Sequence, residues 1–234
     1  MLMDWEQFIH LDQRLTLMLN GSDSLFMDGV MMTITSTWTW IPLGVVLLYV
    51  LIKNNEIASI GLILVLLALC ILFADQMSSG FCKPYFHRFR PTNDPLLMYQ
   101  VDVVNNYRGG QYGFFSSHAS NTFSLCVFLS LLFRHRMLSL LLTSWALLNC
   151  YSRIYLGVHY LGDVLVGILW GSLVGFFFYF VYKKIAIKLN RESHSFISSQ
   201  YTSTGYLIID MELFKIAILL TYLFVLFKAL FINY

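Results

Sequence analysis

Six long stretches of predominantly apolar residues constrain this chain more than any other feature of its sequence. They lie at roughly residues 27–52, 57–80, 119–133, 137–153, 162–182 and 212–232. A helix needs about 20 apolar residues to cross a bilayer, and most of these stretches approach that length. The third and fourth are short, so we expect flanking residues to extend them. The pattern predicts an all-α fold, a polytopic membrane helical bundle with about six transmembrane helices.

The composition agrees with a membrane protein. Hydrophobic residues make up 58% of the 234 residues and charged residues 12%, with a mean hydropathy of +0.67. Soluble domains are about 45–50% apolar and about 25% charged, so a soluble enzyme and a disordered chain are excluded. The net charge of +2 is too small for nucleic-acid binding. Membrane lipids are the expected partners, and the sequence gives no sign of an obligate protein partner.

The first 21 residues differ from the apolar stretches that follow. Apolar side chains recur at helical spacing, while Glu6, Asp12 and Arg14 fall on the opposite side. This pattern predicts an amphipathic helix lying in the membrane interface over residues 1–21, although a helix packed on the bundle fits equally well. The first long stretch contains Pro42 after a Thr-rich half, so we expect it to be irregular.

We expect a single membrane-embedded domain over residues 1–234. Its chemistry should lie in a core at about 57–182, followed by a cytoplasmic loop at 183–211 and a last transmembrane helix at 212–232. The orientation follows from basic residues that strict alternation places on one side: Lys53, Arg134, Arg136, Lys183, Lys184, Lys188 and Arg191. The positive-inside rule makes that side cytoplasmic, so the segment 81–118 and the turn 153–162 should face outward.

Three polar segments on the outward side are not explained by membrane insertion. They are KPYFHRFRP at 83–91, FSSH at 115–118, and SRIYLGVHYLGD at 152–163. Lys83, Arg90 and Arg153 can together surround a phosphate, the arginines through two-point hydrogen bonds. Ser116 and the backbone amides of Ser117 and His118 lie where a helix is expected to begin, which also suits an anion.

Two histidines and one aspartate add reactive groups to these cations. His159 and Asp163 are four residues apart, so their side chains meet on a helical turn. The carboxylate can fix the histidine tautomer and leave the other ring nitrogen free as a nucleophile. His118 remains as a general acid for the leaving oxygen. These groups predict phosphoryl transfer that needs no metal and no cofactor, because the cations supply the positive charge.

The three segments resemble the signature of the type 2 phosphatidic acid phosphatases: Lys-x6-Arg-Pro, then Pro-Ser-Gly-His, then Ser-Arg-x5-His-x3-Asp. The first and third elements match at every fixed position, whereas Phe115 replaces the Pro and Ser117 the Gly of the second. The resemblance covers roughly residues 57–182. It implies phosphate binding by Lys83, Arg90, Ser116, Ser117 and Arg153. It also implies His118 as the acid, His159 as the nucleophile that becomes a phosphohistidine, and Asp163 as its orienting carboxylate.

The resemblance implies a bacterial lipid phosphatase in the inner membrane, with its active site facing the periplasm or exterior. Because hydrolysis of undecaprenyl pyrophosphate is a common task of such short members of the family, we expect this lipid as the first choice of substrate. A lipid A phosphatase and a phosphatidylglycerophosphate phosphatase are the alternatives. A transporter that binds lipid phosphates without hydrolysing them is an alternative of another class. Binding alone, however, does not need the pair formed by His159 and Asp163, or His118.

The remaining polar residues have plainer interpretations. Basic residues at a membrane border commonly anchor lipid headgroups, and we assign that role to Arg88, Arg108 and Lys228. Asp75 is costly in lipid and should face the bundle, either beside the site or in an interhelical hydrogen bond. The long outer loop 92–115 could form a lid or contact a headgroup.

Overall fold

The computed structural model describes residues 5–188 and 199–231, which consist of helices and the connections between them. The α-helices are α1 (Trp5–Leu19), α2 (Leu25–Thr35), α3 (Ile41–Asn54), α4 (Ile57–Asp75), α5 (Lys83–Phe86), α6 (Ser117–Phe133), α7 (Arg136–Tyr155), α8 (Leu161–Lys188) and α9 (Ile208–Ala229). Short 3-10 turns occupy Thr37–Trp40, Pro91–Asn93 and Val104–Asn106, and a π-helical segment occupies Gln76–Cys82. The predicted all-α class is confirmed.

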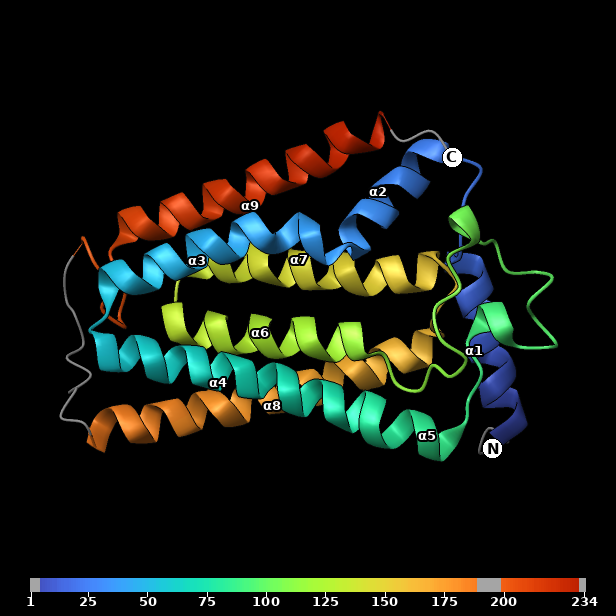
Figure 1. The fold of residues 1–234 in the computed structure, drawn as a ribbon, viewed down its shortest axis with the longest axis horizontal. Coiled ribbons are helices and arrows are strands. Elements are labelled where there is room, and N and C mark those ends of the chain that lie inside the picture. The colour runs from blue at the N-terminus through green and yellow to red at the C-terminus, as the bar shows by residue number, and fades with distance from the viewer. Residues whose placement is uncertain (1–4, 189–198, 232–234) are drawn as a thin grey trace.

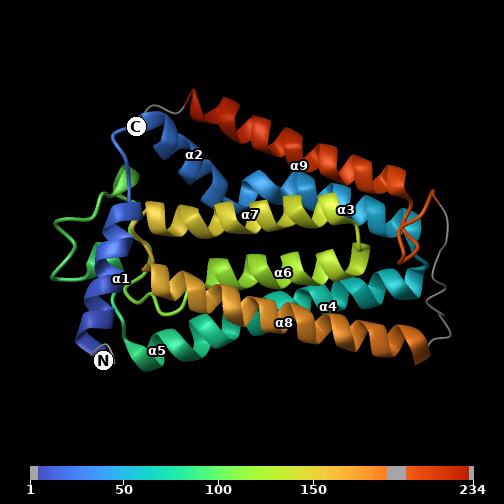
Figure 2. The same cartoon turned by 180° about the vertical axis from the view of Figure 1, so that it is seen from behind.

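The long helices run side by side along the longest axis of the molecule, and α1 lies across one end of them (Figures 1 and 2). Helix α6 packs against α4, α7 and α8, while α9 packs on α2 and α3. The long connection between α5 and α6 folds over the same end as α1 (Figure 1). That end also receives the last turn of α7 and the first turn of α8.

Each of the six predicted apolar stretches forms helix. By length and composition, three of the described helical segments can cross a membrane: Thr37–Asn54, Ile57–Phe86 and Leu161–Lys188. Large apolar side chains such as Val65, Leu169 and Leu223 are exposed on the outer surface of the bundle. Such a surface suits a lipid environment, where no hydrophobic penalty attaches to exposed Leu and Val.

The first apolar stretch is irregular, as predicted. Helix α2 ends at Thr35, a 3-10 turn follows, and α3 begins at Ile41 with Pro42 in its first turn. The break leaves backbone carbonyls without helical partners. The indole of Trp40 donates to the Ile34 carbonyl at 2.8 Å, and the Thr39 hydroxyl donates to the Thr33 carbonyl at 2.6 Å. These side chains satisfy the carbonyls that a broken helix exposes.

The second apolar stretch extends further than its sequence pattern. After Asp75 the backbone widens into the π-helical segment and then returns to α-helical geometry from Lys83 to Phe86. A π turn inserts an extra residue and thereby changes which face the following residues present. In this structure it turns Ser78, Ser79 and Lys83 toward the start of α6, which they contact through Ser117.

Close packing of α8 on α6 depends on three glycines spaced four residues apart. A Cβ atom built on Gly167, Gly171 or Gly175 would lie 2.7, 2.2 or 2.4 Å from the backbone oxygen of Ser116, Ser120 or Ser124. No side chain fits at those distances. Small residues at this spacing let two membrane helices approach closely, and the approach fixes the start of α6 beside the start of α8.

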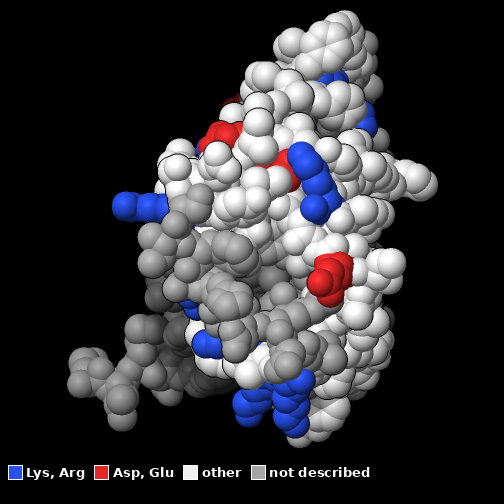
Figure 3. Space-filling view, turned by 90° about the vertical axis from the view of Figure 1, so that its left-hand side faces the viewer, with Lys and Arg blue, Asp and Glu red and all other residues white. Residues whose placement is uncertain are grey.

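The opposite end of the bundle carries the basic residues that were predicted to be cytoplasmic. The turns between α3 and α4 and between α6 and α7, and the end of α8, lie there (Figure 1). Figure 3 views this end directly and shows several Lys and Arg side chains on it. Arg191 lies outside the described residues. The loop expected at 183–211 has helical residues at both of its ends, because α8 continues to Lys188 and α9 already begins at Ile208, while residues 189–198 lie outside the described ones.

Helix α1 occupies residues 5–19 of the amphipathic helix predicted at 1–21, whose first four residues lie outside the described ones, and it differs from the prediction in the position of Asp12. The sequence put Asp12 on the polar, exposed side, whereas its side chain is buried against the bundle. Asp12 accepts hydrogen bonds from Arg88 and from the backbone of Gly162. A carboxylate can be buried when such donors replace water, so the helix packs on the bundle through a polar residue.

Candidate active site

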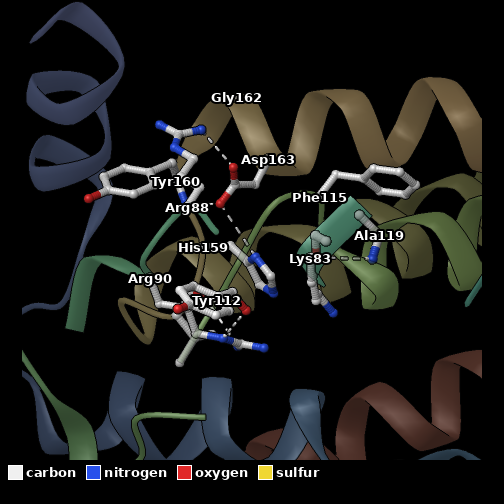
Figure 4. Close-up of polar contacts among 12 residues, drawn as sticks. Lys83, Arg88, Arg90, Tyr112, Phe115, Ala119, His159, Tyr160, Gly162 and Asp163 are labelled. Atoms are coloured by element: carbon white, nitrogen blue, oxygen red, sulfur yellow. Dashed lines mark hydrogen bonds and ion pairs between the residues drawn. The ribbon is translucent and has the colours of Figure 1, made fainter. Parts of the chain in front are cut away.

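All three polar segments of the sequence meet at the end of the bundle covered by α1. The predicted residues come from different elements: Lys83 from α5, Arg90 from the loop after it, Ser116–His118 from the start of α6, Arg153 from the last turn of α7, His159 from the connection to α8, and Asp163 from the first turn of α8. Figure 4 shows Lys83, Arg90 and His159 directed toward a common space, with Asp163 behind the histidine.

His159 and Asp163 form a buried pair. His159 Nδ1 lies 3.6 Å from Asp163 Oδ2, and the aspartate side chain has no exposed surface. The distance is longer than a hydrogen bond, but it places the carboxylate on the Nδ1 side of the ring. Asp163 Oδ2 also accepts the backbone N–H of Tyr160 at 3.1 Å. The turn before α8 therefore fixes the carboxylate, and Nε2 is the ring nitrogen left for chemistry.

Arg90 and Arg153 are both buried, and polar groups of the outer loop and of the end of α2 hold them. Arg90 Nε donates to the Tyr112 carbonyl at 3.1 Å. Arg153 Nη1 donates to the hydroxyls of Thr35 and Tyr107. Arg153 Nε is buried and has no hydrogen-bond partner within the residues that the structure describes. A buried donor of this kind needs an acceptor, and a phosphate oxygen would supply one.

Lys83 belongs to a chain of hydroxyl groups between α4 and α6. Its Nζ donates to Ser117 Oγ at 2.6 Å and to Ser79 Oγ at 3.3 Å. Ser79 in turn donates to Asp75 Oδ1 at 3.2 Å. Ser78 donates to the Phe115 carbonyl at 2.6 Å, which ties the second segment to the π-helical turn. Asp75 thus reaches Lys83 through Ser79, a residue of the same continuous helical segment. Of its two expected surroundings, the place beside the site is the one that this contact supports.

The start of α6 presents the second segment to the pocket. Ser116 is the N-cap residue, and its hydroxyl accepts the Ala119 N–H at 3.4 Å. The N–H groups of the first turn lack helical acceptors, so this terminus attracts an anion. Ser117 occupies the position where the family signature has Gly, and its hydroxyl accepts a hydrogen bond from Lys83. The cations that act on His118 are Arg153, Lys83 and Arg90, and His159 also lies near it.

The site has an excess of positive charge, and this charge helps to lower the pKa values of two loop residues, His159 and Arg90. Burial, reinforced by Arg90, Arg153 and Lys83, lowers the pKa of His159 well below its usual value. Burial and the neighbouring Arg153 lower the pKa of Arg90 to about 10. Both shifts come first from burial, which disfavours the charged form, and then from neighbouring positive charge. A bound phosphate would offset that charge, and a neutral His159 is the form that can act as a nucleophile.

Two predicted headgroup anchors have other partners. The prediction for Arg88 was wrong: its guanidinium contacts Asp163 and Asp12 at 2.7 and 2.6 Å. Arg108 donates to the Thr92 carbonyl at 2.8 Å and ties the outer loop together, while the residue stays exposed, so its role as a headgroup anchor stays a prediction. A single basic residue near a membrane border gives no indication of its partner, because both carboxylates of Arg88 come from distant segments.

The sequence did not indicate several residues that shape the pocket. Thr35 and Tyr107 hold Arg153, and Gly113 packs on the histidine pair, where a Cβ atom would lie 3.1 Å from Asp163 Oδ2 and 3.5 Å from His159 Nδ1. These residues fall outside the three segments. The glycine series of α8 did have a readable signal, namely small residues at every fourth position from Gly167 to Gly175.

No set of three His, Cys, Asp or Glu side chains that could hold a metal ion occurs within residues 5–188 and 199–231. The positive charge of the pocket comes from Lys83, Arg90 and Arg153. These side chains lie around His159, and their charge lowers its pKa. The fold and the site together define a membrane-embedded phosphatase.

The chain belongs to the PAP2 superfamily, the type 2 phosphatidic acid phosphatases, whose model matches residues 58–186. A relative from Bacteroides thetaiotaomicron, named lipid A 4'-phosphatase, is 41% identical over 184 residues, covering 78% of this chain and 82% of the relative. A protein of the same name from Porphyromonas gingivalis is 38% identical over 177 residues, covering 76% and 75%. No solved structure matches the chain significantly.

Proposed function

We propose that this protein is a lipid A phosphatase that removes the 4'-phosphate at the outer face of the bacterial inner membrane. The support for the substrate is the similarity to two relatives named lipid A 4'-phosphatase, which extends over three quarters of the chain. This similarity favours the lipid A alternative over undecaprenyl pyrophosphate, which the sequence analysis put first, and over phosphatidylglycerophosphate.

The observation that carries the mechanism is the position of His159 between a carboxylate and three cations. In the proposed complex, Lys83, Arg90 and Arg153 bind the phosphate oxygens, together with Ser116, Ser117 and the N–H groups that begin α6. Charge-assisted hydrogen bonds from arginine are among the strongest available to a phosphate. The same contacts stabilise the additional charge on the equatorial oxygens in the transition state.

The first step forms a phosphohistidine. His159 Nε2 attacks phosphorus, the bond from phosphorus to the sugar oxygen breaks, and the leaving oxygen takes a proton from His118. Asp163 stabilises the positive charge that develops on the His159 ring, because its carboxylate lies on the Nδ1 side. The dephosphorylated lipid then leaves the site.

The second step returns the enzyme to its starting state. Water attacks phosphorus, His118 accepts a proton from that water, and the bond between phosphorus and Nε2 breaks. Inorganic phosphate departs with the added oxygen, and His159 is again neutral. A transporter would need the cations but not this pair of histidines, so the pair favours hydrolysis.

The proposed orientation rests on the separation of charge along the bundle. The phosphate segments lie at one end, and the other end has the last turns of α3 and α8, with Lys53 and Lys183, and the turn with Arg134 (Figure 1). Basic loops favour the cytoplasmic side, so the site would open to the periplasm. Its position at the end of the apolar helices would let a headgroup enter while the acyl chains remain in lipid.

The substrate proposal is tested with purified protein in detergent micelles. Bis-phosphorylated lipid A, each of its monophosphorylated forms, undecaprenyl pyrophosphate and phosphatidylglycerophosphate are supplied at equal concentration, and released phosphate is measured. We expect the highest kcat/KM on lipid A that carries the 4'-phosphate, with mass spectrometry locating the phosphate that remains. Preferential hydrolysis of undecaprenyl pyrophosphate would reject the lipid A assignment and keep the phosphatase mechanism.

The orientation is tested with single cysteines in a background lacking the four native ones. Asn105, in the loop at the site end, and Ser199, near the start of α9, are both exposed. An impermeant thiol reagent applied to intact spheroplasts should label a cysteine at 105 and spare one at 199. The reverse labelling would place the active site on the cytoplasmic side.

A further inference from the structure

Arg88 joins two buried carboxylates from opposite parts of the chain. Its Nη1 lies 2.7 Å from Asp163 Oδ1, and its Nη2 lies 2.6 Å from Asp12 Oδ2. The guanidinium carbon lies 4.1 Å from the centre of the Tyr160 ring, which supports the group from one side. Figure 4 shows Asp163 between Arg88 on one side and His159 on the other. Arg88 therefore adjoins the carboxylate of the proposed catalytic pair.

Asp12 also holds the start of α8. Its Oδ1 accepts the Gly162 N–H at 2.8 Å, and the Thr16 hydroxyl accepts the Leu161 N–H at 2.9 Å. The first N–H groups of a helix lack internal acceptors and need outside partners. Helix α1 supplies two of them. Gly162 allows the approach, since a Cβ atom there would lie 2.9 Å from Asp12 Oδ2.

The two oxygens of Asp163 have separate partners. Oδ1 binds Arg88, whereas Oδ2 accepts the Tyr160 N–H and faces His159. Because the side chain is fully buried, its charge depends on these donors and on Arg88 as its ion-pair partner. The contact with Arg88 also fixes the rotation of the carboxyl plane, and with it the position of Oδ2 beside His159.

Arg88 itself is held by Asp12. Its side chain retains 28% of its surface exposed, so it could turn toward solvent if one of its two carboxylate partners were removed. With Asp12 present, the guanidinium binds one carboxylate with each terminal nitrogen. Such a planar two-sided contact has a geometry that lysine cannot reproduce.

We propose that Arg88 and Asp12 are positioning residues of the active site. Helix α1 would then contribute to catalysis through Asp12 and would not be only a membrane-surface helix. Arg88 positions Asp163 for His159, and Asp12 positions Arg88. This inference rests on the proposed function, because it concerns the orientation of the nucleophile in that reaction.

The test measures kcat and KM of lipid phosphate hydrolysis for Arg88→Gln, Arg88→Lys, Asp12→Asn and Asp12→Glu. A displaced nucleophile lowers kcat while substrate binding persists, and we expect a fall of about 10- to 100-fold for Arg88→Gln and Asp12→Asn. Asp12→Glu should recover part of the rate, since it keeps the charge. Arg88→Lys should not recover the full rate, because an ammonium group cannot hold both carboxylates in one plane.

Two control variants separate positioning from stability. Glu6→Gln removes an exposed carboxylate of the same helix and should leave kcat unchanged. Thr16→Val removes the cap on Leu161 but not the contact with Arg88, so it should lower the Tm and leave kcat per vanadate-binding site within about twofold of the wild type. Normalising the rate to vanadate-binding sites removes the contribution of misfolded protein from every variant.

The double variant Asp12→Asn/Arg88→Gln completes the design. If Asp12 acts through Arg88, the double variant should be no slower than Arg88→Gln alone. If the fold losses in kcat of the two single variants multiplied in the double variant, Asp12 would not act through Arg88. A wild-type kcat in Arg88→Gln would overturn the inference as a whole. In either case a dead His159→Ala variant beside an active wild type would leave the proposed function intact. A wild type that released no phosphate from any lipid would instead reject the function itself.

Discussion

The backbone N–H of Ser116 donates a hydrogen bond of 3.1 Å to the carbonyl oxygen of Asp163. This bond joins the start of α6, which bears the helix-terminal amides of the pocket, to the first turn of α8, which bears the orienting carboxylate. The glycines of α8 make it possible, because they bring the two helices close enough for backbone contact along their shared length. The geometry of the site therefore depends on how α8 packs on α6 farther along the bundle, away from the site.

Gly171→Ala should destabilise the protein, although alanine is the better helix former. A Cβ atom at this position would lie 2.2 Å from the Ser120 carbonyl oxygen, so α6 and α8 would have to separate. We expect a loss of about 1–3 kcal/mol, seen as a lower Tm in detergent. Gly61→Ala is the matched control in α4, where no atom lies within 4 Å of the new Cβ. It should be neutral or slightly stabilising, and equal Tm values for the two variants would contradict the packing argument.

His159→Ala should abolish phosphate release and leave the fold intact, because we assign bond formation with phosphorus to this side chain alone. Incubation with a 32P-labelled lipid phosphate should give an acid-labile, base-stable phosphoprotein in the wild type and none in the variant. His10→Ala, which alters an exposed histidine of α1, serves as the control and should retain full activity. Turnover in His159→Ala near the wild-type rate would disprove the assignment.

His118→Ala should be most harmful on substrates with poor leaving groups. A nitrophenolate leaves without protonation, whereas a sugar alkoxide needs a proton as the bond breaks. The ratio of kcat/KM between variant and wild type should therefore be much lower on an alkyl or sugar phosphate than on nitrophenyl phosphate. Equal losses on both substrates would argue that His118 binds phosphate and does not donate the proton.

Activity should persist in excess EDTA, because Lys83, Arg90, Arg153 and the amides at the start of α6 supply the charge that a metal ion supplies in other phosphatases. Vanadate should inhibit competitively, since it can adopt the five-coordinate geometry of the transition state. Phosphate release is measured after dialysis against the chelator, with added Mg²⁺ as the comparison. Loss of activity in EDTA with recovery in Mg²⁺ would require a different mechanism.

On the acidic side of the pH profile, kcat/KM should decrease only at an unusually low pH. Burial and nearby cations lower the pKa of His159 well below 6.5, so the ring stays neutral and nucleophilic as the pH decreases through that value. In the profile of kcat/KM, which reports the free enzyme, the acidic midpoint should therefore lie below 6.5. A midpoint at or above 6.5 would show that the cations do not act on this histidine as the structure indicates.

The sequence alone was sufficient for the fold class, and it predicted the residues of the three polar segments that the structure brings to one end of the bundle. Apolar stretches near the length of a bilayer crossing permit few structures other than helices, because only a helix or a closed barrel satisfies its backbone in lipid. The three polar segments were equally informative, since Lys83, His118 and His159 have no purpose in an apolar bundle except at a site. The apolar stretches and the polar segments are local properties, so they can be recognised from the order and spacing of residues along the chain.

The partners of each side chain were decided only by the tertiary structure. Arg88 and Asp12 are 76 residues apart, and Arg153 and Thr35 are 118 apart, so their contacts leave no periodic signal in the sequence. Arg88 was taken for a headgroup anchor and Asp12 for an exposed residue for that reason. A charged residue takes whichever partner the packed helices bring within reach, because ion-pair energy depends on distance in space and not on separation along the chain.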